Sequence, residues 1–149
     1  MTTGLVVLGV AVVLALGFGL WRAASDGRFR GTHRVRGVEE PGAEEAPESV
    51  LTGTAYDGQL GERATLLQFS SAFCAPCRAT RRVLDDVARI VPGVRHVEVD
   101  AEHHLDLVRR LGILRTPTTL VLDPEGREVS RASGAPTKQA VIASLAPLA

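Results

Sequence analysis

The chain of 149 residues contains two cysteines, Cys74 and Cys77, and they are separated by Ala75 and Pro76. Two thiols at positions i and i+3 can close a small disulfide ring and open it again, which is the chemistry of a redox site. Zinc ribbons and knuckles also use paired cysteines with this spacing. The pair alone therefore leaves two chemistries open, thiol–disulfide exchange and metal binding.

The four histidines do not complete a zinc site by their spacing. Sites of the two-Cys, two-His type place two histidines about three to five residues apart. His96 and His103 are too far apart for this pattern, His103 and His104 are adjacent, and His33 lies in a charged segment near the amino end. The sequence also contains no glycine-rich phosphate loop and no nucleophile elbow. We therefore expect no metal and no cofactor.

The cysteines follow a predicted strand and open a predicted helix. The run Thr65–Ser70 directly upstream is typical of a buried strand. Downstream, apolar residues recur at helical spacing, namely Val83, Leu84, Val87, Ile90 and Val91. We predict a strand over residues 64–69 and a helix over residues 75–91, which Pro92 and Gly93 end.

Strands and helices alternate along the rest of the carboxy-terminal two thirds of the chain. We expect an extended segment over residues 51–54, strands over 94–100, 118–122 and 127–132, a turn over 123–126, and helices over 103–111 and 136–145. This order predicts an α/β domain with a mixed central sheet flanked by helices, spanning residues 51–149.

The amino end is predicted to be a membrane anchor, residues 1–22. Gly4–Trp21 is an uninterrupted apolar run, close to the roughly 20 residues that cross a bilayer, and Arg22 ends it. The alternative is a cleaved signal peptide. Against it, Met1–Thr3 carries no basic side chain and no small-residue cleavage site follows the run. We favour a retained single-pass helix that contacts membrane lipid through residues 4–21.

Residues 23–50 are predicted to form a charged linker rich in proline and glutamate. Arginines come first and glutamates follow, with prolines among them, and apolar periodicity is missing. The formal net charge of the whole chain is zero, so nothing in its overall charge favours binding to nucleic acid.

Residues 51–149 resemble the thioredoxin family. The resemblance rests on the element order, on Cys74-Ala75-Pro76-Cys77 at the start of a long helix, and on the segment Gly112–Thr118 with its Thr116-Pro117. With the anchor and linker, the chain looks like a membrane-anchored bacterial thioredoxin-like thiol–disulfide oxidoreductase. The resemblance implies a thioredoxin-like fold.

The expected position of the cysteines implies different roles for them. Cys74 at the helix amino end would carry a thiolate stabilised by free N–H groups, and it would attack a disulfide. Cys77, one turn further in, would be more buried and would resolve the mixed disulfide. Ala75 and Pro76 lie between them, and Pro76 restricts the backbone there. Phe73 stands where the family commonly has tryptophan, and it offers an apolar rim to a substrate.

The resemblance also implies that Pro117 follows a cis peptide bond and faces Cys74. Backbone groups near Thr116 would then be free to pair with an extended substrate chain. We accordingly predict substrate binding at Phe73, Ala75, Pro76, Thr116 and Pro117.

Two residues depart from the family's pattern. A buried carboxylate that is thought to move the proton of the second thiol corresponds here to Gln68, and glutamine cannot exchange a proton near neutral pH. The lysine of the adjacent strand corresponds to His96. An imidazole could act as the base instead. The alternative is that His96 only fills a position at the edge of the sheet.

The predicted function is reduction of protein disulfides, with electrons from an unidentified reductase or small thiol. Two alternatives are other redox enzymes, namely a disulfide isomerase or oxidant and an extracytoplasmic reductase of the cytochrome-maturation type. A third alternative is a tethered, non-catalytic module that binds extended peptides at the Pro117 groove.

The charges beside the anchor predict its orientation in the plasma membrane. Five arginines lie between Arg22 and Arg36, against the single acid Asp26, whereas the amino side of the anchor has no charged side chain. Because positive residues are retained in the cytoplasm, we expect the catalytic domain there. An extracytoplasmic domain is the alternative, by analogy with anchored relatives.

Overall fold

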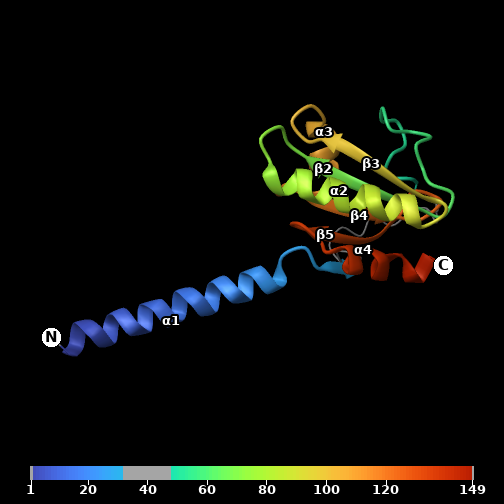
Figure 1. Cartoon of the computed structure of the whole chain (residues 1–149). Coiled ribbons are helices and arrows are strands. Elements are labelled where there is room, and N and C mark those ends of the chain that lie inside the picture. Colours follow the sequence, from blue (N-terminus) through green and yellow to red (C-terminus); the bar gives the residue numbers. More distant parts are fainter. Residues whose placement is uncertain (1, 32–47, 149) are drawn as a thin grey trace, which may run out of the picture.

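The computed structural model describes residues 2–31 and 48–148 (Figure 1). A long amino-terminal helix, α1 (Thr2–Ser25), projects from an α/β domain. The remaining elements are β1 (Phe29–Gly31), β2 (Ala64–Ser70), α2 (Ala75–Ile90), β3 (Val94–Asp100), α3 (Leu105–Arg110), β4 (Thr118–Leu122), β5 (Glu128–Ser133), α4 (Lys138–Leu145) and a closing 3₁₀ turn over Ala146–Leu148.

The five strands form one mixed sheet in the order β1-β5-β4-β2-β3. β2 runs parallel to β3 and antiparallel to β4, and the remaining pairs are antiparallel. All seven residues of β2 are buried. A strand covered on both faces needs a nearly continuous apolar run, which explains why Ala64–Ser70 shows little polar alternation.

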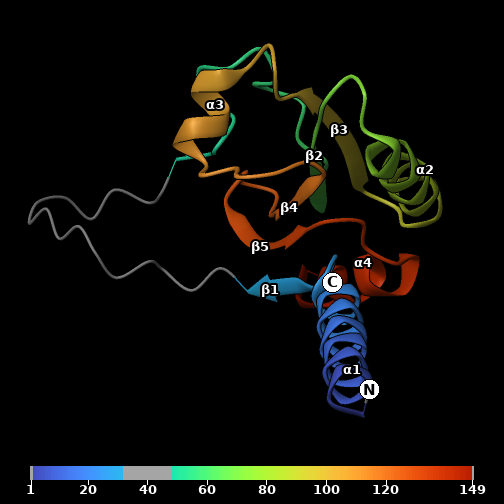
Figure 2. The same ribbon diagram turned by 90° about the vertical axis from the view of Figure 1, so that its left-hand side faces the viewer.

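Helices cover both faces of the sheet and give three layers (Figure 2). On one face α2 and α4 pack against apolar residues of the strands, among them Leu66 and Val121, and Val141 of α4 lies in the same cluster. On the other face α3 and residues 50–60 pack against a second cluster that includes Phe69 and Leu120. The predicted α/β class, with a mixed sheet between helices, is confirmed.

The structure differs from the prediction at the first strand. Residues 51–54 form hydrogen-bonded turns rather than an extended segment, because the Thr54 N–H donates to the Leu51 carbonyl over 3.0 Å. The edge strand is instead β1, inside the segment predicted to be a linker, and it pairs antiparallel with β5. Partly buried Phe29 packs against the α2/α4 cluster. A strand of three residues is too short to show periodicity. Residues 32–47 of the predicted linker lie outside the described residues.

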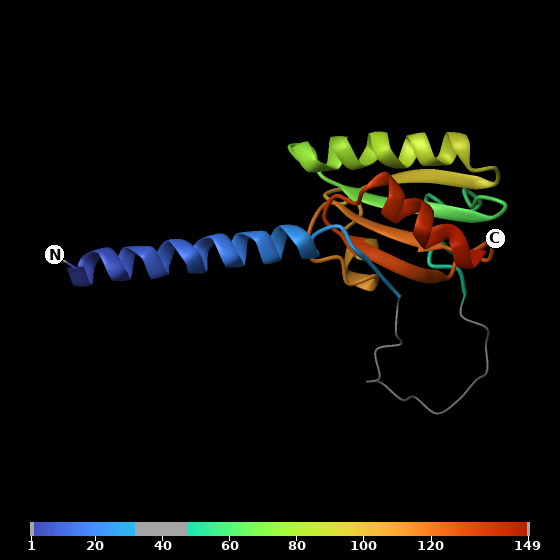
Figure 3. The same cartoon turned by 60° about the horizontal axis from the view of Figure 1, so that its bottom comes forward.

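The end of α1 is joined directly to the domain. Its Gly4–Ser25 segment is long and apolar enough to cross a membrane, by length and composition. Just beyond it, Asp26 pairs with Arg115 at 2.5 Å, and the Gly27 N–H donates to the Ser133 carbonyl over 2.9 Å. α1 therefore leaves the domain from the end of the sheet at which α2 begins (Figures 1 and 3).

Gly27 is required at this junction for two reasons. Its φ is +70°, and a Cβ there would lie 2.2 Å from the Ala135 carbonyl oxygen. Gly53 has nearly the same φ, +71°, but open space around it. Comparing the two positions separates the cost of the backbone conformation from the cost of the close contact.

We expect Gly27→Ala to weaken the junction more than Gly53→Ala weakens its own turn. Amide hydrogen exchange at Phe29–Gly31 should accelerate about tenfold or more in the first variant, which corresponds to roughly 1.4 kcal/mol, because backbone must move to admit the methyl group. The matched variant Gly53→Ala should leave exchange in β1 unchanged. Equal exchange in both variants would show that the contact of Gly27 with Ala135 does not hold the junction.

Candidate functional site

The two cysteines lie at the amino end of α2 and form a disulfide, with their Cα atoms 5.2 Å apart. Cys74 is the N-cap residue, and its Sγ accepts a hydrogen bond of 3.1 Å from the Cys77 N–H. Pro76 lies in the first turn, where its missing N–H costs no helical hydrogen bond. Cys74 is partly exposed, whereas Cys77 is only 2% exposed. The two sulfur atoms therefore differ in access, as the sequence predicts.

The loop before β4 is fixed beside the cysteine-bearing segment. The Thr116–Pro117 peptide bond is cis, which confirms the expectation for Pro117. The hydroxyls of Ser71 and Thr116 are 3.1 Å apart and hydrogen bonded, and the Gly134 N–H donates to the Pro117 carbonyl over 2.7 Å. Residues 70–73, 115–117 and 133–135 thus meet at one end of the sheet.

Two large apolar side chains are exposed at this end. Phe73, directly before Cys74, is 100% exposed, and Leu114, two residues before Thr116, is 96% exposed. The sequence predicted Phe73 as a rim residue but missed Leu114. The sequence signal for Leu114 was a leucine outside any predicted helix or strand, between the end of a helix and the Thr-Pro loop. Exposed apolar residues in such a place are typical of contact surfaces.

Beneath the cysteines a buried polar network reaches the surface of α2. The Gln68 side-chain amide donates to the Cys77 carbonyl over 2.9 Å and to the Ser70 hydroxyl over 2.8 Å. Because a carbonyl can only accept, the Gln68 carbonyl oxygen faces away from it, 3.1 Å from His96 Nε2. His96 Nδ1 is 2.6 Å from an Asp85 carboxylate oxygen.

Two acceptors therefore face the His96 ring. One is the Gln68 carbonyl oxygen at Nε2 and the other is the Asp85 carboxylate at Nδ1. The His96 side chain is 6% exposed. It contacts Gln68, and only through Gln68 does the network reach the backbone of Cys77. The proposed role of His96 in proton transfer remains a prediction, and the geometry makes its route indirect.

Comparison with known proteins agrees with this geometry. The sequence model of the thioredoxin family matches residues 48–147. The chain belongs to the thioredoxin family. A putative thioredoxin H10 of Arabidopsis thaliana is 28% identical over 116 residues, which is 77% of this chain and 72% of the relative. A thioredoxin of Chlamydia trachomatis is 30% identical over 93 residues, 62% of this chain and 90% of the relative.

Solved thioredoxin structures share the fold. The thioredoxin NaTrxh of Nicotiana alata superposes with a TM-score of 0.52 at 24% identity, over 58% of this chain and 73% of that one. A Fasciola hepatica thioredoxin gives 0.53 at 22%, over 60% and 84%. Family membership and the close Cys74–Cys77 pair together identify a thiol–disulfide oxidoreductase.

An acidic cavity of about 320 Å³ lies on one side of this thioredoxin site. It is lined by residues 70–72, which lead to the cysteines, and by Tyr56, Glu98 and Asp100. A hydrogen bond with His103 lowers the pKa of Asp100, so this carboxyl stays ionised at neutral pH. Burial, followed by the nearby charges of Asp100 and Glu98, raises the pKa of Tyr56, which therefore stays neutral. Two carboxylates thus line the cavity beside the active-site loop, and each has a basic partner, Arg81 for Glu98 and His103 for Asp100.

We expect Gln68→Met to destabilise this thioredoxin because it leaves the buried Ser70 hydroxyl and His96 Nε2 without their partner. An unsatisfied buried group costs about 1–3 kcal/mol, and methionine matches glutamine in length. The measurement is the free energy of unfolding of the full chain in denaturant, with the disulfide intact. The control is Gln139→Met on the exposed face of α4, which should change stability by less than about 0.5 kcal/mol. Equal losses in the two variants would contradict a structural role of the network.

Proposed function

We propose that the protein reduces protein disulfides through the Cys74/Cys77 dithiol. In the reduced enzyme the Cys74 thiolate attacks one sulfur of a substrate disulfide. A mixed disulfide forms and the first substrate thiolate leaves, taking up a proton. The Cys77 thiolate then attacks Cys74 Sγ, which forms the Cys74–Cys77 disulfide and releases the second substrate thiolate. Two electrons pass to the substrate, and a reductase or small thiol must return them.

The observation that carries this proposal is the difference between the two cysteines at the amino end of α2. In that place the helix dipole and unpaired N–H groups stabilise negative charge, and the Cys77 N–H already donates to Cys74 Sγ. A thiolate is therefore favoured at the more exposed sulfur, where a substrate can reach it. Cys77 is covered, so it reacts after the mixed disulfide brings a sulfur to it.

The surroundings of the pair support a protein substrate. Phe73 and Leu114 offer exposed apolar contacts on the two segments that meet at Pro117. Within the described part of the chain, the backbone N–H and C=O of Thr116 make no hydrogen bond, so both are free to pair with an extended peptide. The predicted substrate-binding residues Ala75 and Pro76 are exposed at the start of α2.

We expect Cys74→Ser to abolish disulfide reduction, and Cys77→Ser to accumulate mixed disulfides with substrate proteins, because the resolving thiol is missing. In the reduced wild-type chain, Cys74 should be alkylated at mildly acidic pH while Cys77 stays protected. Mass spectrometry of the alkylated peptides measures both rates. Equal rates at the two cysteines would contradict these roles.

Two further measurements separate the alternatives. A reduction potential near about −270 mV favours a reductase, whereas values near about −180 or −120 mV favour an isomerase or an oxidant. Activity that survives in the double variant Cys74→Ser/Cys77→Ser would favour a peptide-binding module, which needs no thiol.

We further propose that α1 is a retained anchor and that the domain lies in the cytoplasm. Arg22, Arg28 and Arg30 follow the apolar segment closely and are exposed, so they are available to hold this side inward. A cytoplasmic domain would meet a reducing pool of thiols, which suits a reductase.

Fusions after Ala149 test the orientation of the full chain. We expect fluorescence from a green fluorescent protein fusion and no activity from an alkaline phosphatase fusion, because the phosphatase needs an oxidising compartment. Replacing Arg22, Arg28 and Arg30 by glutamine should lower the fluorescent fraction. Phosphatase activity without fluorescence in the wild-type fusion would place the domain outside. A free, shortened domain in the soluble fraction would indicate a signal peptide instead.

A further inference from the structure

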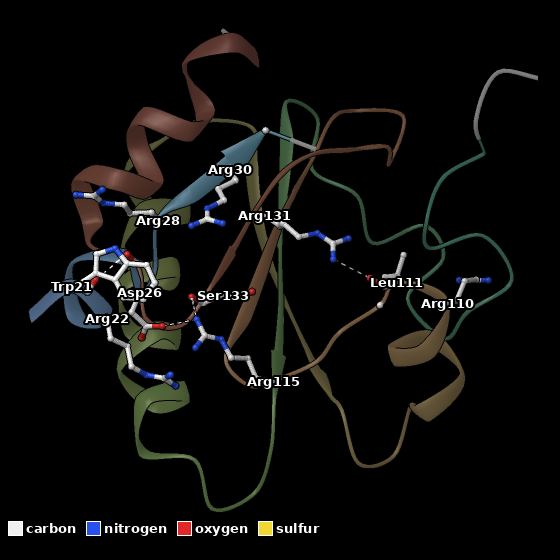
Figure 4. A pocket seen from close by; sticks show the side chains of 13 residues that line it. Trp21, Arg22, Asp26, Arg28, Arg30, Arg110, Leu111, Arg115, Arg131 and Ser133 are labelled. Carbon is white, nitrogen blue, oxygen red and sulfur yellow. Dashed lines mark hydrogen bonds and ion pairs between the residues drawn. The ribbon is translucent and has the colours of Figure 1, made fainter. Parts of the chain in front are cut away.

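A cleft of about 860 Å³ lies where α1 meets the domain. Six arginines and one aspartate line it, and they come from opposite sides (Figure 4). The arginines are Arg22 on α1, Arg28 and Arg30 in and beside β1, Arg110 and Arg115 around the α3–β4 loop, and Arg131 on β5. The cleft is not used by the thiol chemistry, and it is strongly basic.

Two of these arginines already have acidic partners. Arg115 pairs with Asp26, the one acid that the described residues contribute to the lining, and Arg131 makes two contacts of 2.6 Å with the Glu128 carboxylate. Both also donate to backbone carbonyls, so their guanidinium groups are held in place rather than free to swing into solvent. They form a fixed wall of the cleft.

The other four arginines have no acidic partner among residues 2–31 and 48–148. Arg110 donates to the Val50 carbonyl, which is neutral. The side chains of Arg22, Arg28 and Arg30 make no hydrogen bond or ion pair within the same ranges. Uncompensated guanidinium groups that share one cleft repel one another, and an anion between them would relieve this repulsion.

The position of the cleft indicates where such an anion comes from. Trp21, Arg22 and Ser25 of the last turns of α1 line it. Tryptophan and the first arginine after an apolar helix mark the level of the lipid headgroups. Provided that α1 is the anchor proposed above, the cleft therefore opens at the headgroup layer of the membrane.

We propose that this cleft binds the phosphate of an anionic phospholipid headgroup. Guanidinium groups present paired N–H donors that match phosphate oxygens, and Arg30 belongs to a strand fixed by pairing with β5, which Arg28 directly precedes. Arg22 adds a charge from the anchor itself. The site thus joins anchor, edge strand and the Arg115 loop through one bound lipid.

The single tryptophan of the chain, Trp21, reports on the cleft that it lines. The full chain in a non-ionic detergent is titrated with short-chain phosphatidylglycerol while Trp21 emission is followed. We expect a saturable change. Short-chain phosphatidylcholine, which is zwitterionic, should give a dissociation constant at least tenfold higher. Inorganic phosphate should bind more weakly than phosphatidylglycerol, since it lacks the acyl chains that rest against α1.

Matched variants separate the effect of the cleft on lipid binding from the effect of the protein's overall charge. Arg28→Gln/Arg30→Gln should weaken phosphatidylglycerol binding tenfold or more. Arg82→Gln/Arg95→Gln removes the same charge at α2 and at β3, the opposite edge of the sheet, and should leave the affinity unchanged. If hydrogen exchange shows that β1 is lost in the first variant, Arg22→Gln on α1 replaces it and should weaken binding at least threefold.

Each contrary result overturns the proposal in a different way. Equal losses in the two double variants would show attraction to overall charge only. Equal affinities for the two lipids would show binding of acyl chains alone. An equal affinity for inorganic phosphate would make the cleft a site for a free anion. Because emission is measured without turnover or a bilayer, failure of the proposed reductase activity or orientation leaves this readout unaffected.

Discussion

The complete burial of β2 is the constraint on which the rest of the site depends. With β3 on one side, β4 on the other and helices over both faces, the strand has one position in the domain. Its carboxyl end leads through residues 71–73 into Cys74. The same end of the sheet receives the loop before β4, because β4 is antiparallel to β2 and begins beside its last residues. The cysteines and Pro117 meet because the strands that carry them are neighbours.

The same strand carries Gln68, and this residue changes what the buried side of the site can do. Both amide protons of Gln68 are used, on Ser70 and on the Cys77 carbonyl. Its oxygen is used by His96. A carboxylate at this place could take a proton from a thiol, but an amide cannot. His96 is separated from Cys77 by the whole Gln68 side chain.

The consequence is that the network stabilises the first turn of α2 rather than supplying a proton acceptor next to Cys77. Activation of the thiols then depends on the helix amino end and on its N–H groups. Among the described residues His96 reaches the Cys77 backbone through Gln68, so its predicted role in proton transfer would be indirect. The departure from the family's pattern at residue 68 thus has a local consequence, which is a change in the hydrogen bonds beneath Cys77.

The sequence predicted those parts of the fold that have a strong local signal. The apolar run of β2, the helical spacing in α2 and the paired cysteines are such signals, and the cis bond at Pro117 followed from family resemblance. The sequence could not predict β1, because three residues have no periodicity and their pairing with β5 is a tertiary contact. Leu114 and the basic cleft were missed for a related reason. The exposure of a side chain, and the meeting of arginines from separate elements, depend on the tertiary structure and leave no pattern in a single segment.

The position of β1 also changes the relation between anchor and active site. The sequence placed a linker of 28 residues, 23–50, between them, which would let the domain swing far from the membrane. In the structure only Asp26–Arg28 separate α1 from β1, and Asp26 and Gly27 already contact the loops beside Pro117. If α1 is embedded, the reactive Cys74 is held close to the membrane surface. A substrate disulfide or an electron-donating thiol at that surface then meets a high effective concentration of the site, whereas one in the bulk solution does not.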